Sequence, residues 1–164
     1  MTLVAARASA ATMTAFPLPP PMRRALDLAA VAAEAGEVPV GAVITLGDEI
    51  IAEARNAMRG SLDPTAHAEI VAIRHAATRL GQARLDGCTL WVTLEPCAMC
   101  AAAIGLARLD ALRFAADDPK GGGVVHGARI FAQATCHHRP DVLGGIGEDE
   151  AGAMLKRFFA ERRA

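Results

Sequence analysis

Two short motifs combine residue types that bind metals and move protons. The first is H-A-E, with His67 and Glu69, and the second is P-C-A-M-C, with Cys97 and Cys100. An imidazole and two thiolates are three suitable ligands for one Zn²⁺, and three protein ligands leave the fourth tetrahedral position open for water. Glu69 is then available to carry a proton beside that water. The motifs therefore predict one catalytic zinc ion per chain, held by His67, Cys97 and Cys100.

Other interpretations of these motifs exist. A C-x-x-C pair alone is also typical of a redox pair or half of a structural zinc site. His67 and Glu69 are two positions apart, so the pattern is not the H-E-x-x-H of metalloproteases. A zinc-stabilised binding module without activity is a further alternative, although a structural site usually has four protein ligands. The H-A-E motif and the proline before Cys97 favour the catalytic site.

The remaining cysteines and histidines have weaker patterns. Cys88 lies in an expected core strand and is interpreted as packing, and Cys136 begins a C-H-H run that resembles a second metal site. That run lacks a clear fourth ligand, so a loop is favoured there. His75 and His126 are interpreted as surface or packing residues. The chain is not a short, cysteine-dense secreted sequence, so its 4 cysteines favour free thiols and a cytoplasmic location.

Length and charge narrow the class of protein. The 164 residues suffice for one domain with a substantial core. No apolar run approaches the ~20 residues of a transmembrane helix, so we expect a soluble protein without membrane contact. The net charge of −1 does not indicate a strongly basic nucleic-acid binder. Any contact with RNA must therefore come from a local basic patch.

The N-terminal segment differs from the rest in composition. Residues 1–21 are rich in alanine, threonine and proline, and we expect a disordered extension before a single domain at 22–164. The segment weakly resembles a transit or signal peptide, but it has no apolar central region. A start codon assigned too early is another interpretation, with Met13 or Met22 as the true start.

Hydrophobic periodicity and turn residues predict alternating helices and strands. Asp63 and Pro64 suit the cap and first position of a helix. Helices are expected at 22–35, 63–80, 97–106, 127–132 and 148–163. Strands are expected at 38–44, from 50, at 88–94, at 111–115 and near 142, the first two as a hairpin. Such alternation indicates a mixed sheet with helices on both faces. The stretch 55–62 is expected to be a polar connection.

The expected elements explain how the ligands meet. His67 and Cys97 both fall near helix starts, where free N–H groups stabilise thiolates. Two such helices, starting side by side at the carboxyl ends of adjacent strands, would bring the three ligands together. Gly41 lies inside an expected strand, where it marks either close approach by a ligand or tight packing.

Longer motifs around these residues carry a family resemblance. They are E-V-P-V-G-A-V from Glu37, D-P-T-A-H-A-E-I from Asp63, V-T-L-E-P-C-A-M-C from Val92, and the F-F and R-R pairs near the C-terminus. Over residues 22–163 the sequence resembles the bacterial tRNA-specific adenosine deaminases of the TadA type, within the cytidine/deoxycytidylate deaminase superfamily. The metal motif alone specifies only the superfamily. The resemblance implies a three-layer α/β/α, cytidine-deaminase-like fold with a central mixed five-stranded sheet.

The resemblance also implies roles for individual residues. His67, Cys97 and Cys100 would bind zinc, with Glu69 as the general acid and base. Substrate contacts would come from Asn56, which hydrogen-bonds the flipped base, and from Asp118, Lys120 and Arg162 near the RNA. Residues 121–147 depart most from the family pattern.

The implied reaction is hydrolytic deamination of adenosine to inosine at wobble position 34 of a tRNA anticodon loop. The partners would be a tRNA anticodon stem-loop and a second copy of the chain. The alternative within the superfamily is a deaminase of small nucleobases or nucleosides, of guanine or cytosine type.

Overall fold

The computed structural model describes residues 17–164. The first part of the expected extension, residues 1–16, lies outside the described residues. Helix α1 (Pro20–Glu34) includes Pro20 and Pro21, so it begins two residues before the predicted start at 22. Proline suits the first turn of a helix because the N–H groups there have no helical partner. Across residues 17–164, no helix is both long enough and apolar enough to cross a membrane.

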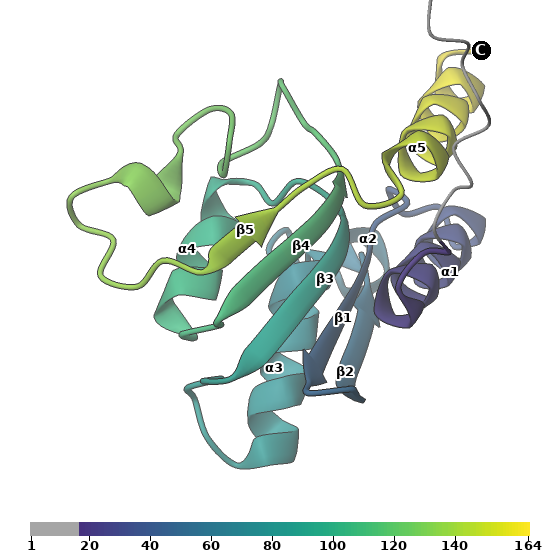
Figure 1. Cartoon of the computed structure of the whole chain (residues 1–164). Helices are drawn as coiled ribbons and strands as arrows, with labels where there is room; N and C mark the ends of the chain where they lie inside the picture. Colours follow the sequence, from purple (N-terminus) through teal and green to yellow (C-terminus); the bar gives the residue numbers. More distant parts are fainter. Residues whose placement is uncertain (1–16) are drawn as a thin grey trace, which may run out of the picture.

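A mixed sheet of five strands forms the centre of the fold, as predicted (Figure 1). The strands are β1 (Gly41–Leu46), β2 (Glu49–Arg55), β3 (Cys88–Leu94), β4 (Ala111–Ala116) and β5 (Asp141–Leu143). Their order across the sheet is β2-β1-β3-β4-β5. Strand β1 is antiparallel to both β2 and β3, which confirms the hairpin, whereas β3, β4 and β5 are parallel.

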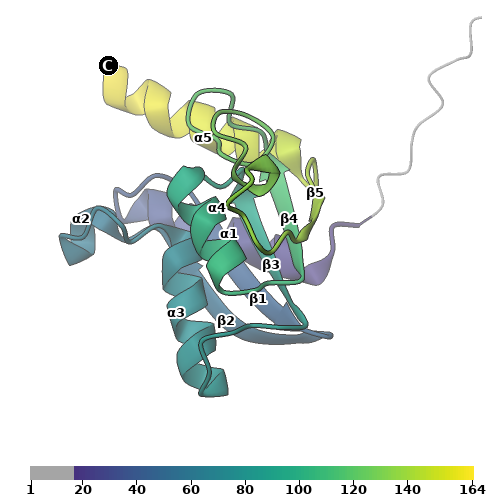
Figure 2. The ribbon, with the colours of Figure 1, turned by 90° about the vertical axis from the view of Figure 1, so that its left-hand side faces the viewer.

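Helices cover both faces of the sheet, so the three-layer architecture is confirmed (Figures 1 and 2). Helices α1 and α5 (Glu148–Arg163) lie on one face, and their buried residues pack with Val43 and Ala115. Helices α3 (Ala68–Leu80) and α4 (Ala98–Leu106) lie on the other face, over a larger core that includes Leu90 and Phe114. The metal motifs belong to the α3 and α4 layer.

Gly41 is a packing glycine. A Cβ at this position would overlap the Ala25 carbonyl oxygen and lie 2.8 Å from the Ala29 backbone nitrogen. Helix α1 therefore rests directly on the backbone of β1. Of the two interpretations of Gly41, the structure supports close packing by a helix.

Several predicted element boundaries are wrong. Helix α3 begins at Ala68 instead of Asp63, because the Asp63 carboxylate accepts hydrogen bonds from the Thr65 backbone and hydroxyl and closes a separate turn. A short helix, α2 (Met58–Ser61), interrupts the expected polar connection. The 3₁₀ helix η1 (Ile130–Ala132) is shorter than the predicted helix at 127–132. Strand β1 begins at Gly41, three residues after the predicted start at 38.

The edge strand β2 contains a β-bulge that a side chain covers. Ile44 and Thr45 of β1 pair with Ala52 and Ile50, so Ile51 is the extra residue. Arg79 of α3 donates from Nη1 to the carbonyl oxygens of Ile50 (3.1 Å) and Ile51 (3.2 Å). The helix thereby holds the irregular part of the edge strand.

Candidate active site

The metal motifs meet at one edge of the sheet. His67 is the residue before α3, and Cys97 is the residue before α4; both have extended backbone, and Cys100 lies in the first turn of α4. Strands β2 and β3 run in the same direction because each is antiparallel to β1. Both helices therefore start at the same edge. The expectation of adjacent strands is wrong, because β1 lies between β2 and β3.

The three ligand atoms form a compact triangle. His67 Nδ1 lies 3.6 Å from Cys97 Sγ and 3.5 Å from Cys100 Sγ, and all three atoms lie within 4.8 Å of one another. With bonds of ~2.0 Å to nitrogen and ~2.3 Å to sulfur, a tetrahedral metal places these atoms about 3.5 Å apart. The triangle fits one metal ion in tetrahedral coordination. Among residues 17–164 it is the only such group of histidine, cysteine and acidic side chains.

The two thiols are unequal. The hydrogen bond from the Cys100 thiol, followed by that from His67, lowers the pKa of Cys97 to about 4. The same hydrogen bond, together with burial, raises the pKa of Cys100. The hydrogen bond with Cys97 raises the pKa of His67. Of the two thiols, Cys97 is therefore the one that ionises more readily.

Glu69 is a buried carboxylate beside this triangle. It lies in the first turn of α3 and is 4% exposed, and burial raises its pKa to about 7. It lines a cavity of about 170 Å³. The ten residues around this cavity are Val38, Val40, Asn56, Met58, His67, Glu69, Leu94, Glu95, Cys97 and Asp118. The site thus combines a group that could hold a metal ion, a buried carboxylate and apolar walls.

Asn56 has a fixed orientation in this cavity. Its Oδ1 atom accepts a hydrogen bond of 2.9 Å from the Ala68 backbone N–H, which determines how the amide is turned. The amide NH₂ is therefore the group that Asn56 offers to a ligand. Asn56 was predicted to contact a base, and the structure places it in the same cavity as Glu69.

Asp118 lies where the first cavity meets a second. The second cavity, of about 470 Å³, shares Val38, Leu94 and Asp118 with the first and extends to Lys120 and to Phe159 of α5. Asp118 Oδ1 accepts backbone hydrogen bonds from Lys120 and Gly121. Lys120 lines only the second cavity, so the structure places it farther from the metal-binding residues than Asp118.

Arg162 lies outside both cavities. Its guanidinium carbon is 3.6 Å from the centroid of the Phe158 ring, and its Nη2 donates to the Gly36 carbonyl oxygen at 3.1 Å. These contacts join the end of α5 to the turn after α1. A contact between Arg162 and RNA stays a prediction.

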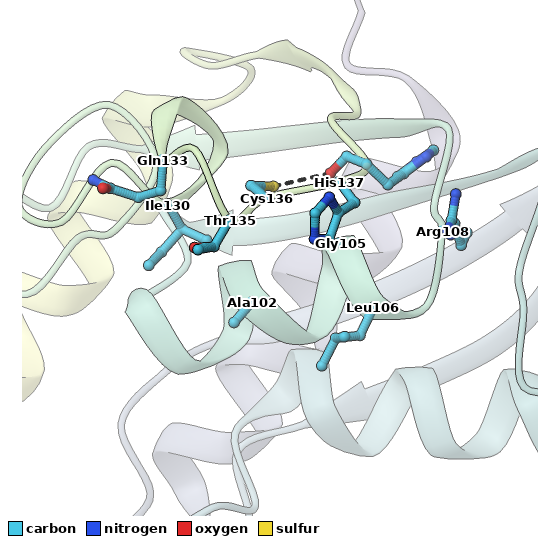
Figure 3. Close-up of a pocket in the computed structure, with 10 residues that line it drawn as sticks. Ala102, Gly105, Leu106, Arg108, Ile130, Gln133, Thr135, Cys136 and His137 are labelled. Atoms are coloured by element: carbon cyan, nitrogen blue, oxygen red, sulfur yellow. Dashed lines mark hydrogen bonds between the residues drawn. The ribbon is translucent and has the colours of Figure 1, made fainter.

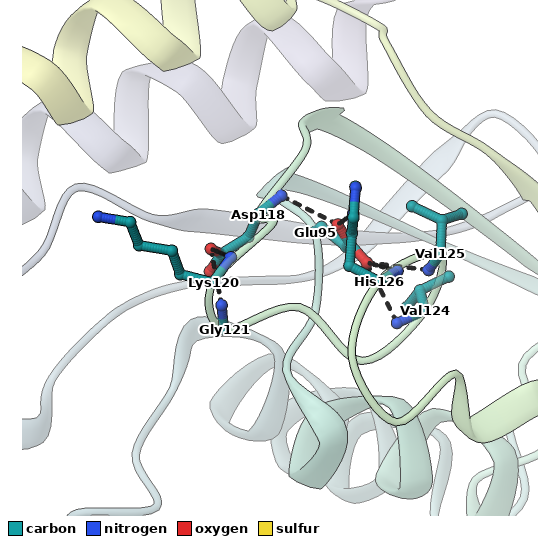
Figure 4. Close-up of polar contacts among 7 residues, drawn as sticks. All are labelled: Glu95, Asp118, Lys120, Gly121, Val124, Val125 and His126. Atoms are coloured by element: carbon teal, nitrogen blue, oxygen red, sulfur yellow. Dashed lines mark hydrogen bonds and ion pairs between the residues drawn. The ribbon is translucent and has the colours of Figure 1, made fainter.

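Glu95 is a site residue that the sequence analysis missed. Its carboxylate is buried and accepts hydrogen bonds from the loop that carries Asp118 (Figure 4). Burial disfavours ionisation of Glu95, but hydrogen bonds from the Asp118 and His126 backbones outweigh it and hold its pKa below the usual value. One indication of this role was present in the sequence, because Glu95 is an acidic residue between an expected buried strand and the P-C-A-M-C motif.

The Cys136-His137-His138 segment lines a separate cavity of about 360 Å³ beside α4 (Figure 3). Cys136 Sγ donates to the His138 carbonyl oxygen at 3.2 Å, and His138 Nε2 donates to the Leu109 carbonyl oxygen at 2.7 Å. In the described part of the chain, no metal-binding group includes these residues. Residues 136–138 belong to no helix or strand, so the loop expected there is confirmed.

Comparisons with known proteins agree with this geometry. The family model of MafB19-like deaminases matches residues 20–163. A tRNA-specific adenosine deaminase of Agrobacterium fabrum is 53% identical, over 87% of this chain and 93% of its own. A solved structure from a study of A-to-I editing by tRNA:A34 deaminases has a TM-score of 0.81 and 52% identity, and covers 82% of this chain and 98% of its own.

A guanine deaminase structure from Bacillus subtilis is more distant, with a TM-score of 0.60 and 35% identity over 88% of this chain and 92% of its own. The matches to the adenosine deaminases are closer in both sequence and structure. The chain belongs to the MafB19-like deaminase family, among the tRNA-specific adenosine deaminases.

Proposed function

We propose that this protein is a zinc-dependent enzyme that hydrolyses adenosine to inosine at wobble position 34 of a tRNA anticodon loop. The observation that carries the proposal is the triangle of His67, Cys97 and Cys100 beside the buried carboxylate of Glu69, in a cavity of about 170 Å³. The similarity to tRNA-specific adenosine deaminases supports adenosine in RNA as the substrate.

The donor set favours zinc as the metal. Two thiolates and one neutral imidazole are typical zinc ligands, and the two negative charges of the thiolates offset the charge of the cation. When bound, Zn²⁺ would supply a water molecule whose pKa is lowered toward ~7. His67, Cys97 and Cys100 would hold one ion per chain and leave one coordination position open.

Glu69 would carry the protons of the reaction. Burial raises its pKa to about 7, so the carboxylate is able to accept and release a proton near neutral pH. It would take a proton from the attacking water and deliver it to ring N1 while the oxygen adds to C6. It would then pass the second proton of that water to the amino group as the bond from C6 to nitrogen breaks. Adenosine and water give inosine and ammonia.

The cavity would select a single base. Its volume is below the ~300–1,000 Å³ of pockets that enclose drug-sized ligands, so it suits one flat ring system. The NH₂ group of Asn56 would donate to an acceptor atom of that base. A base must leave its stack to enter, which is easier for a loop nucleotide than for a paired one.

The adjoining cavity would receive the rest of the RNA. It continues from Asp118 past Lys120 to Phe159, which is 43% exposed. An exposed aromatic ring and a lysine are suited to stacking with a base and to contact with a phosphate. Arg162 at the end of α5 would add a second positive charge on that side.

A direct assay tests the substrate. Zinc-loaded protein would be incubated with an anticodon stem-loop RNA that has adenosine at position 34, and separately with adenosine, guanine and cytosine. We expect inosine in the RNA and little conversion of the free compounds. Conversion of only a free base or nucleoside would refute the tRNA activity and support the small-molecule alternative, to which the guanine deaminase relative points.

A homodimer in the cytoplasm is part of the same proposal. Leu106 of α4 lines the 360 Å³ cavity and is 82% exposed, and a second copy of the chain would bury it. A reducing compartment would keep Cys97 and Cys100 free for metal. Light scattering at micromolar concentration should give twice the 17.0 kDa chain mass, and a monomer would contradict the dimer.

A further inference from the structure

Glu95 connects the metal-binding segment to the loop that carries Asp118 and Lys120. It follows β3 directly and precedes Cys97 by two residues. Its side chain is completely buried, although carboxylates are rarely buried without partners. The mechanism above gives this carboxylate no proton to carry. Its burial therefore needs another explanation.

The carboxylate binds one loop at five points (Figure 4). Oε2 accepts from the Asp118 backbone N–H at 2.9 Å and from His126 Nδ1 at 2.8 Å. Oε1 accepts from the backbone N–H groups of Val124, Val125 and His126, at 3.2, 2.9 and 3.0 Å. All five donors lie between residues 118 and 126, so a single side chain joins both ends of this 118–126 loop.

Glycines let the loop lie against the metal-binding segment. A Cβ at Gly122 would lie 2.5 Å from the Glu95 carboxyl carbon, and a Cβ at Gly123 would overlap the Ala98 backbone nitrogen. The Gly123 backbone N–H also donates to the Pro96 carbonyl oxygen at 2.8 Å. The loop is therefore in direct contact with the chain on both sides of Cys97. This contact gives a physical reason for glycine at positions 122 and 123.

We propose that Glu95 is a positioning residue that holds the 118–126 loop, and with it Asp118 and Lys120, in place against the metal ligands. The proposal rests on the proposed function for the substrate that this loop meets. Asp118 lines both cavities and Lys120 lines the second, so a released loop would open the wall between them. His126 contributes two of the five contacts, through its backbone N–H and its imidazole, and supports the same position from the loop side.

The test uses zinc-loaded protein without RNA. Amide hydrogen exchange would be measured at Asp118, Val124, Val125 and His126 in the wild type and in Glu95→Gln. A glutamine offers one acceptor oxygen and one NH₂ group, so donors that face the NH₂ lose their partner. We expect exchange of these amides to rise about 10–100-fold, the range of a charged hydrogen bond. We also expect zinc to stay at one ion per chain.

Two further variants separate positioning from general destabilisation. His126→Ala removes only the imidazole contact, so we expect a smaller increase confined to the same loop. Glu37→Gln is the matched control, because Glu37 is also a buried carboxylate and accepts N–H groups of Arg59 and Gly60 at 2.9 Å. It should leave exchange in the 118–126 loop unchanged. Unchanged protection in Glu95→Gln, or an equal rise in Glu37→Gln, would overturn the proposal.

A kinetic measurement tests whether the position of the loop affects substrate binding. With stem-loop RNA as substrate, Glu95→Gln should raise KM about tenfold or more and change kcat less, because the loop contacts substrate and moves no proton. A fall in kcat at unchanged KM would overturn the positioning role. Should the wild type leave RNA unchanged, the proposed function fails, while the exchange measurements still decide the role of Glu95.

Discussion

The Oδ1 atom of Asn56 accepts a hydrogen bond from the backbone N–H of Ala68, the residue that follows His67. This 2.9 Å contact ties the Asn56 amide to the first residue of α3. The orientation of Asn56 and the position of His67 are therefore set by the same helix start. A substitution at Asn56 can affect the substrate, the helix start or both, and the two effects are separable.

Asn56→Asp should keep the fold and lose activity. An aspartate still accepts the Ala68 N–H, but it has no NH₂ group to donate to a base. We expect the free energy of unfolding to stay within about 1 kcal/mol of the wild type and kcat/KM to fall at least ~10-fold. Asn56→Ala should also lose about 1–3 kcal/mol of stability, because a buried N–H is left unpaired. Equal activity of Asn56→Asp and wild type would contradict the base contact.

Glu69→Gln should abolish proton transfer and leave the metal in place. The amide has a similar shape, but it cannot accept and release a proton, so we expect kcat to fall by about 10²–10⁴-fold. Zinc content by metal analysis should stay at one ion per chain. Glu49→Gln, at an exposed edge-strand carboxylate paired with Arg79, is the control and should keep full activity. Activity that survives in Glu69→Gln would assign the proton carrier elsewhere.

Loss of a ligand or of the metal should have the same result. Cys100→Ser replaces a soft thiolate, and we expect loss of bound zinc and of activity. Treatment of the wild type with a chelator should do the same, and added Zn²⁺ should restore it. Cys88→Ala is the control, because Cys88 is buried in β3 away from the metal group. If Cys100→Ser bound zinc as tightly as Cys88→Ala, the ligand set would be wrong.

Gly41→Ala should destabilise the fold by about 1–3 kcal/mol or more, because the added Cβ overlaps the Ala25 carbonyl oxygen and forces α1 away from β1. Gly152→Ala is the matched control. Position 152 lies inside α5, and a Cβ there meets no atom within 4 Å in the described part of the chain. Alanine there should stabilise by up to about 1 kcal/mol. Urea unfolding gives the free energy of unfolding of both variants. Equal values for the two variants would refute the packing role of Gly41.

The ion pair between α1 and α5 should give a small, pH-dependent contribution. Arg23 Nη1 donates to Glu150 Oε2 at 3.0 Å, and this hydrogen bond lowers the pKa of Glu150 from 4.5. A carboxylate with a lowered folded pKa adds stability above its unfolded pKa and loses it as the pH falls through the folded pKa. Both side chains are nearly half exposed, so we expect at most about 1 kcal/mol.

Unfolding of wild type and Glu150→Gln in metal-free protein, at pH 7 and again at pH 3, measures this contribution. The difference between the two proteins should shrink at the lower pH. Glu161→Gln, on the same helix and in no ion pair among residues 17–164, should show no such change. A difference for Glu150→Gln that grew toward acid pH would reverse the assigned sign.

Sequence predicts those parts of the fold that depend on local pattern. Strand β3 and helix α5 have the predicted bounds. The apolar residues of β3 and the acidic start and basic end of α5 are local signals, because each involves residues that are close in sequence. The start of α3 was wrong because an Asp-Pro pair suits both a helix start and a tight turn, and Asp63 forms the turn. The sequence also indicated that His67, Cys97 and Cys100 would meet, because metal chemistry restricts both residue type and spacing, and the structure brings them together.

Strand order and the role of Glu95 depend on contacts that are distant in sequence. Nothing local indicates that β1 lies between β2 and β3, because hairpin pairing specifies only one neighbour of a strand. The five donors to Glu95 come from residues more than twenty positions away. From the sequence alone, Glu95 is therefore seen only as an acidic residue next to the P-C-A-M-C motif.

The bulge in β2 bears on how the protein behaves at high concentration. A regular edge strand offers a row of free N–H and C=O groups to which another chain can add a strand. In β2 the extra residue at Ile51 breaks that row, and the Arg79 guanidinium already occupies two of its carbonyl oxygens. The edge is therefore a poor template for cross-β growth, and we expect Arg79 to lower the tendency of the protein to aggregate.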